Sequence, residues 1–206
     1  MRPENEPAGQ KGRSFIEEAR RAQIVASAIE VIAEVGFAQA SLAKIAKHAG
    51  ISKGVISYHF TGKEELMEEV VERTYGGIAE NVVVRMDGLT TATELLRAHI
   101  LSVAEQMADH RTHIKALGEI LINLRTADGE LRYGMHTNEG LYQPIEGIFR
   151  LGQESGEFRP FDRRVMAVTH QAAVDNMFAY WIANPGHDLN AHAAELADLM
   201  ERACKA

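Results

Sequence analysis

The stretch SLAKIAKHAGISKGVISYHF, residues 41–60, contains two short helical patterns separated by only three residues. Ser41 and Ser52 each precede one pattern, and serine is a preferred helix N-cap because its hydroxyl accepts a hydrogen bond from a free backbone N–H group. Gly50 lies in the connection, where glycine readily ends a helix. Two short helices joined by a three- or four-residue turn that contains glycine form a helix-turn-helix. The stretch therefore predicts this motif, whose second helix typically enters the major groove of DNA.

The second helix of the motif has one polar and one apolar face. Gly54 leaves room for the backbone to approach a duplex closely. Lys63 starts the next helix, where its ammonium group can meet a phosphate beside unpaired backbone N–H groups. For Ser41 and Ser52, capping alone is an equally complete explanation. The side chains expected to face DNA on this helix are Ser52, Lys53, Ser57, Tyr58 and His59, while Val55, Ile56 and Phe60 can turn inward.

Further helical patterns flank the motif. Apolar residues recur at helical spacing over residues 22–35, and Gly36 follows as a stop signal. Thr61 and Glu64 have the spacing of a capping box for the next helix. That helix contains the pair Gly76-Gly77, which marks either a bend between domains or the end of the helix. Four helix starts within about 50 residues predict a helical N-terminal domain.

Charge is distributed unevenly along the 206 residues. Residues 1–63 hold nine Lys/Arg and six Asp/Glu, a net charge of +3, whereas residues 64–206 hold thirteen and twenty-three, a net charge of −10. Only the first third therefore suits a polyanion such as DNA. The chain has no apolar run of the roughly 18 to 20 residues that a membrane helix needs, no signal-peptide pattern and a single cysteine, Cys204. We therefore expect a cytoplasmic protein without a membrane partner.

Residues 22–70, AQIVASAIEVIAEVGFAQASLAKIAKHAGISKGVISYHFTGKEELMEEV, resemble the DNA-binding domain of the tetracycline-repressor (TetR) family of bacterial transcriptional regulators. The resemblance rests on the order of the four helices, the Ala-Gly turn, the Tyr-x-Phe ending of the recognition helix and the Lys-x-x-Leu that follows. It departs at Ser57, where the family commonly has an aromatic residue, so this chain lacks a ring there. By position, the resemblance implies operator contacts at Ser41, Lys53, Tyr58, His59 and Lys63.

The remaining two thirds of the chain predict a second all-α unit. Thr91 and Glu94 form a second capping-box pattern, and Asp162 and Asp188 precede the last two long helical patterns. We expect an all-α protein of about nine helices, with a three-helix N-terminal helix-turn-helix domain. The expected division is a disordered N-terminal arm at 1–13, the DNA-binding domain at 14–62, and a ligand-binding and dimerisation domain at 63–206.

The TetR resemblance also implies a ligand cavity in the second domain and a dimer interface built from its last two long helices. Candidate cavity residues are Met86, Met107, Leu121, Met177, Phe178 and Trp181. A methionine or aromatic stripe at helical spacing is equally what an ordinary core shows. Candidate interface residues are Met166, Ala173, Leu196 and Met200. Their spacing permits a dimer without requiring one, because any amphipathic helix needs only some partner.

Other chemistries find little support. The run Gly50-Ile51-Ser52-Lys53-Gly54 matches a hydrolase nucleophile elbow, but that motif follows a strand and here a short helix precedes it. None of the nine histidines has a carboxylate three residues before it, and no zinc or phosphate-binding pattern occurs. His110 and His113 lie on neighbouring turns and can also be simple solvated histidines. We expect no catalytic residue, no metal site and no cofactor.

These observations together predict a ligand-responsive, homodimeric transcriptional repressor. It would bind a palindromic operator in double-stranded DNA and be released by a small, largely apolar effector. Two alternatives remain. A helical-bundle enzyme would turn over a defined substrate, and an effector-independent DNA-binding protein would bind without sequence preference. The acidic second domain disfavours the latter, because a chain that coats DNA gains from basic charge throughout.

Overall fold

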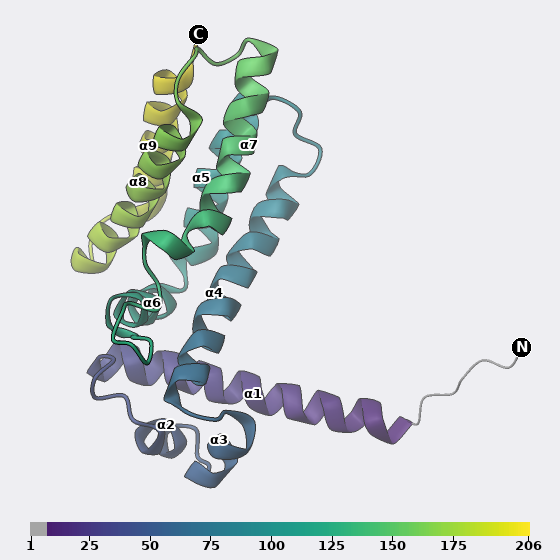
Figure 1. Ribbon diagram of the computed structural model, residues 1–206, viewed down its shortest axis with the longest axis vertical. Helices are drawn as coiled ribbons and strands as arrows, with labels where there is room; N and C mark the ends of the chain where they lie inside the picture. The colour runs from purple at the N-terminus through teal and green to yellow at the C-terminus, as the bar shows by residue number, and fades with distance from the viewer. Residues whose placement is uncertain (1–7) are drawn as a thin grey trace, which may run out of the picture.

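The computed structural model describes residues 8–206, and within them the expected all-α fold is confirmed. In the described range the helices are α1 (Ala8–Val35), α2 (Leu42–His48), α3 (Lys53–His59), α4 (Lys63–Met86), α5 (Ala92–Ala108), α6 (Arg111–Asn123), α7 (Glu139–Ser155), α8 (Arg163–Ala183) and α9 (Leu189–Cys204), with a short 3-10 helix, Met135–Thr137, before α7. Figure 1 shows α1, α2 and α3 at one end of the molecule. From there α4 runs alongside a bundle that contains α5, α7, α8 and α9 (Figure 1).

Polar residues at the helix starts act as the sequence predicts. The side-chain oxygens of Ser41, Ser52, Asp162 and Asp188 each accept a hydrogen bond from a backbone N–H in the first turn of their helix. Thr91 and Glu94 make both hydrogen bonds of a capping box at the start of α5. Each such cap is worth about 1 kcal/mol, because it satisfies backbone donors that have no partner within the helix. These local signals therefore set the helix boundaries.

The capping box predicted for Thr61 and Glu64 is wrong by one residue. The N-cap of α4 is Gly62, which makes no side-chain capping bond. Glu65, not Glu64, accepts hydrogen bonds from the backbone N–H and the hydroxyl of Thr61, both at 2.7 Å. Because the helix begins one residue later than a cap at Thr61 requires, the reaching carboxylate also moves one residue on. The chain is still turned sharply between α3 and α4.

Helix α1 begins at Ala8, within the arm at residues 1–13 for which the sequence predicts disorder. No proline occurs after Pro7 until residue 144, so no ring interrupts the helix. Residues 1–7 lie outside the described range. In Figure 1 the first half of α1 projects past α3 and α4. Phe15 and Ile16 on this projecting part are exposed.

A first hydrophobic cluster joins the helix-turn-helix to the two helices above it. Its buried residues come from α1, α2 and α3, for example Ile24, Ile45 and Ile56, but also from α4 and α6, where Leu66 and Ile120 are fully buried. A boundary between residues 62 and 63 therefore passes through a packed core. The division into two domains stays a proposal, with the first half of α4 and α6 shared by both.

A second hydrophobic cluster fills the bundle around α5. Helix α5 contacts α4, α7 and α9, and its buried face includes Leu96, Ile100 and Met107. Helix α4 continues without a break through Gly76-Gly77, so the glycine pair neither ends nor divides it. This one helix thus packs into both clusters. Among the described residues, no helix combines the length and apolar character needed to cross a membrane.

Candidate DNA-reading surface and ligand cavity

The α2–turn–α3 unit is held from below by buried side chains and opens outward. Gly50 in the turn has φ +67°, a left-handed conformation that glycine adopts without strain. Ile45 and Ile56 are fully buried, and Phe60 is 2% exposed. These anchors fix which side of α3 is turned away from the core. The geometry is that of a helix-turn-helix, as the sequence predicts.

The outer side of α3 is polar and accessible. We call it the DNA-reading face; it consists of Ser52, Lys53, Gly54, Ser57 and Tyr58, all of them exposed, and of the half-exposed His59. The Tyr58 ring is 74% exposed and meets the His59 ring edge-on, with the two ring centres 4.9 Å apart. Ser41, also exposed, caps α2 nearby. An exposed tyrosine hydroxyl, a lysine and two serines offer hydrogen-bond donors for phosphates and base edges.

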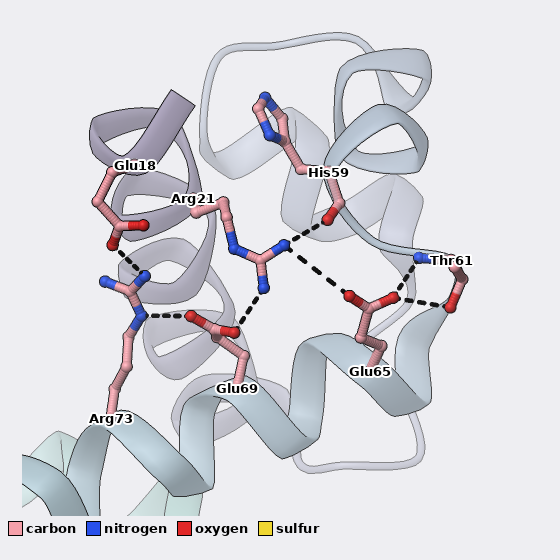
Figure 2. A network of polar contacts seen from close by, with 7 residues as sticks. All are labelled: Glu18, Arg21, His59, Thr61, Glu65, Glu69 and Arg73. Carbon is pink, nitrogen blue, oxygen red and sulfur yellow. Dashed lines mark hydrogen bonds and ion pairs between the residues drawn. The ribbon is translucent and has the colours of Figure 1, made fainter. Parts of the chain in front are cut away.

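Arg21 of α1 ties the end of α3 to α4, and sequence reasoning missed it (Figure 2). Its guanidinium donates to the backbone oxygen of His59 at 2.6 Å and to Glu69 Oε2 at 2.5 Å. It also lies over the Phe60 ring, 4.3 Å from the ring centre. The partners are 38 and 48 residues away along the chain, so no local pattern reveals them. The DNA-reading face is therefore held by charged hydrogen bonds as well as by its core.

Glu69 lies at the centre of this network, with a side chain only 18% exposed. Burial by itself would raise the pKa of its carboxyl, but hydrogen bonds from Arg73 and Arg21 outweigh burial and lower the pKa. Arg73 also bonds Glu18 of α1 (Figure 2). Glu69 is thus an anion at neutral pH, shared by two arginines.

Phe37, in the turn after α1, is held from two sides. Lys63 at the start of α4 donates to the Phe37 backbone oxygen at 2.5 Å, and its ammonium lies 4.1 Å from the centre of the Phe37 ring. Glu119 of α6 accepts from the Phe37 backbone N–H at 2.9 Å. Burial lowers the pKa of the Lys63 ammonium. The first half of α4 and α6 therefore meet at the turn that leads into the helix-turn-helix.

A cavity of about 580 Å³ opens between α4, α6, α7, α8 and the segment before α7. We call it the tyrosine cavity. Its apolar wall is formed by Val71, Leu121, Ile122, Leu131 and Leu141. Its main polar groups are Tyr75 of α4, Tyr133 and Asp175 of α8. The size lies within the range of small-molecule sites, and an apolar wall with a few polar groups is their usual composition.

The predicted cavity residues divide between this cavity and the core. Leu121 lines the tyrosine cavity. Met86 is partly buried against the second cluster. The four others are buried members of that cluster: Met107, Met177, Phe178 and Trp181. Those four do not line the tyrosine cavity, and their role in ligand binding stays a prediction.

The predicted interface residues lie mostly inside the chain. Leu196 and Met200 are 8% and 6% exposed, because this side of α9 packs on α5. Met166 and Ala173 are partly buried against the same cluster. The pattern of an amphipathic helix predicts which residues are buried, but not which neighbouring helix or chain covers them. Leu196 and Met200 are therefore covered within the chain itself.

Among the close pairs of histidines in the structure, the sequence analysis noted His110 and His113 but missed the pair formed by His99 and His170. His170 is fully buried, and its Nε2 lies 3.1 Å from Nδ1 of His99. Burial lowers the pKa of His99 to about 4 and that of His170 to about 3, so both rings are neutral near pH 7. His110 and His113 stack edge-on, with ring centres 5.1 Å apart. In the part of the chain that the structure describes, no three His, Cys, Asp or Glu side chains gather in a way that could hold a metal ion.

The sequence of the helix-turn-helix matches a known family. The family described as "Bacterial regulatory proteins, tetR family" matches residues 24–70, which include both helices of the motif and the start of α4. A relative from Bacillus subtilis, the "Fatty acid metabolism regulator protein", is 29% identical over 182 residues, covering 86% of this chain and 92% of that protein. Residues 24–70 therefore form a DNA-binding domain of the TetR family.

Other relatives match over different lengths. The "HTH-type transcriptional regulator BetI 2" of Chromohalobacter salexigens is 35% identical over 99 residues, covering 48% of this chain and 46% of that protein. Among solved structures, the fatty acid degradation regulator FadR from Bacillus halodurans has a TM-score of 0.79 at 25% identity, covering 88% of this chain and 94% of that one. FadR from Bacillus subtilis in complex with stearoyl-CoA has a TM-score of 0.77 at 28% identity, covering 88% and 98%. The TetR-family likeness thus extends well beyond the helix-turn-helix.

Proposed function

We propose that this chain is a ligand-responsive transcriptional regulator that binds a palindromic operator as a homodimer. In this proposal it acts in the cytoplasm, without catalysis, as a repressor released by a small, largely apolar effector. The observation that carries the proposal is the exposed DNA-reading face of α3, which lies within the segment that matches the TetR family. Arg21, just before that segment, holds this face against α1 and α4. An enzyme has no need of such a face.

The DNA-reading face supplies two kinds of contact. In this proposal Lys53 and His59 contact base edges in the major groove, while Ser52, Ser57 and Tyr58 contact phosphates. Ser41 and Gly54 allow the backbone at the helix starts to approach the duplex. Lys63 uses one N–H donor on Phe37 and keeps two, since an ammonium has three. It can therefore hold the α1–α2 turn and touch a phosphate at the same time.

The exposed side of α8 and α9 is the proposed dimer interface. One helix-turn-helix reads only a few base pairs, so operator binding needs two copies with half-sites on one face of the duplex. The two helices contact each other within the chain. Their outward side carries Val165, Ala172, Ala179 and Tyr180 on α8 and Leu199 on α9. The two alanines would let the α8–α9 pairs of two copies approach closely, and the larger side chains would bury apolar area between them.

The tyrosine cavity is the proposed effector site because its walls are the helices that lead to the DNA-reading face. Val71 and Tyr75 belong to α4, and Leu121 belongs to α6. The same two helices hold Phe37 through Lys63 and Glu119. An effector that shifts α4 against α6 would therefore alter the support of the helix-turn-helix. A coupling of about 1.4 kcal/mol is enough to weaken operator binding tenfold.

Operator binding tests the DNA-reading face. An operator is first selected from random duplexes with the wild-type protein, and affinities are then measured by fluorescence anisotropy at several salt concentrations. Lys53→Ala should relax discrimination at one position by about 1–3 kcal/mol, and Tyr58→Phe should weaken binding to all sequences alike. Lys115→Ala, an exposed lysine on α6, is the matched control and should leave binding unchanged. Normal operator affinity in both α3 variants would refute the assignment of this face.

Sedimentation tests the interface. Ala179→Arg places a charge on the proposed apolar seam, and should yield monomers that bind operator poorly. Ala127→Arg, at an exposed position in the segment between α6 and α7, is the control. A variant at Ala179 that stays dimeric and binds normally would move the interface elsewhere.

A second class of effector follows from the relatives. FadR from Bacillus subtilis was solved with stearoyl-CoA, and its likeness covers most of this chain. A long-chain acyl-CoA is therefore a candidate effector here too. Its phosphates would need basic partners near the mouth of the site.

A further inference from the structure

We propose that the tyrosine cavity takes an organic cation with an apolar tail, its ammonium group placed between the Asp175 carboxylate and the rings of Tyr75 and Tyr133. This inference rests on the proposed function, because it names the chemical class of the effector in the same cavity. The apolar wall would receive the tail, and the polar corner the charged head.

Asp175 is the charged group that lines the cavity. Its Oδ1 accepts a hydrogen bond of 2.8 Å from the amide of Gln171, a neutral donor that leaves the negative charge uncompensated. Within the described part of the chain, the groups that act on Asp175 include no lysine, arginine or histidine. Burial raises the pKa of its carboxyl despite the bond from Gln171. Asp175 is an exposed residue at the edge of the cavity, so its carboxylate can be reached from outside. A bound cation would supply the counter-charge that the carboxylate lacks.

Two tyrosines stand beside the carboxylate. Burial raises the pKa of Tyr75 to about 12, and the nearby Asp175 and Tyr133 contribute to the shift. The three groups are therefore close enough to act on one another electrostatically. Tyr75 stays neutral at physiological pH, and its ring is part of the cavity lining. A cation near such ring faces and a carboxylate is stabilised by both, as in sites that recognise quaternary ammonium groups.

The surroundings of the cavity favour a cation over an anion. None of the described lining residues is lysine, arginine or histidine. Arg132, which lies between the lining residues Leu131 and Tyr133 in the sequence, forms an ion pair of 2.6 Å with Glu68. Its positive charge is therefore compensated by Glu68. Glu72 adds a further negative charge that acts on Tyr133. An acyl-CoA or a fatty acid would bring its anionic head into this field without a partner, which costs affinity.

Three probes with the same octyl tail but a cationic, a neutral or an anionic head show which head group the cavity prefers. The wild-type, full-length protein is titrated calorimetrically with octyltrimethylammonium, 1-octanol and octyl sulfate, each below its micellar concentration, and with stearoyl-CoA. We expect the ammonium probe to bind about tenfold or more tightly than the alcohol, since a charged contact of this kind adds roughly that factor. The sulfate should bind most weakly of the three. Each probe is also tested for release of the selected operator.

Variants locate the preference. Asp175→Asn should weaken the ammonium probe about tenfold or more and leave octanol within about twofold, and Asp175→Glu should retain the preference. Asp109→Asn, an exposed aspartate after α5, is the matched control and should change nothing. Tyr133→Leu should weaken the ammonium probe, whereas Tyr133→Phe keeps the ring and should not. Melting curves confirm that each variant is folded, and the Tyr133 pair gives a second test if Asp175→Asn does not fold.

The outcomes separate this inference from the proposed function. If the sulfate or stearoyl-CoA binds most tightly and releases operator, the cation inference is wrong and the regulator stands. The cation inference is also wrong, and the proposed regulator still stands, if all probes bind with equal affinity or if Asp175→Asn leaves the affinity for the ammonium probe unchanged. If no probe binds while the protein still binds its operator, both the cation inference and the assignment of this cavity as the effector site are refuted.

Discussion

Replacing Arg21 by methionine should loosen α3 from the rest of the protein. Methionine has a similar length and keeps the packing on Phe60, but it removes the donors to His59 O at 2.6 Å and to Glu69 at 2.5 Å. Hydrogen bonds that involve a charged group are worth about 1.5–3 kcal/mol each, and the cation–π attraction to the Phe60 ring, which methionine cannot make, adds about 0.5–1 kcal/mol. Arg73 continues to pair with Glu69, which offsets part of the loss. We therefore expect a total loss of about 2–3 kcal/mol in the free energy of unfolding.

The loss is measured by thermal unfolding followed by circular dichroism at a fixed protein concentration. For a chain of this size, each kcal/mol lowers Tm by about 2–4 °C, so Arg21→Met should lower it by about 4–12 °C. Operator affinity, measured well below Tm, should fall about tenfold if the bound orientation of α3 requires the bond to His59 O.

The matched control is Arg202→Met. Arg202 is 76% exposed and its nitrogen lies 3.9 Å from Asp198, so its removal should cost no more than about 0.5 kcal/mol. If Arg21→Met melts within about 2 °C of the wild type and binds operator normally, the network in Figure 2 does not hold the DNA-reading face, and its apolar core alone does so.

Two further predictions concern stability. Because burial lowers the pKa of His99 to about 4 and of His170 to about 3, the unfolded chain binds more protons below about pH 6.5. Stability should thus be complete above that pH and fall as the pH drops toward 4, by up to about 1.4 kcal/mol per pH unit for each histidine. His170→Gln should flatten this dependence between pH 7 and 5; an unchanged slope would contradict it. Gly152→Ala should lower stability by about 1–3 kcal/mol, because the added Cβ would overlap the buried Phe158 ring. Gly147→Ala in the same helix meets no atom within 4 Å and should be neutral or stabilising, and equal Tm values for the two variants would refute the packing argument.

Local chemistry in the sequence determined the helices and the helix-turn-helix. A serine or aspartate before an apolar repeat acts within one turn of the chain, so Ser41, Ser52, Asp162 and Asp188 mark helix starts whatever surrounds them. The spacing of Ile45 and Ile56 around Gly50 likewise predicts which side of α3 is buried. The DNA-reading face follows as the side that remains. The uneven charge of the two parts of the chain was also readable without a structure.

Only the tertiary structure decided contacts between helices distant in sequence. The pattern of α9 shows that Leu196 and Met200 want burial, but α5 of the same chain covers them where a second chain was expected. Arg21 and Glu69 look like ordinary surface charges in the sequence, since their partners lie tens of residues away. The tyrosine cavity is lined by residues between 71 and 175 that come from several helices, so the pattern of no single helix predicts it. Helical periodicity encodes which side of a helix leaves water, whereas the identity of the partner depends on how all the helices pack at once.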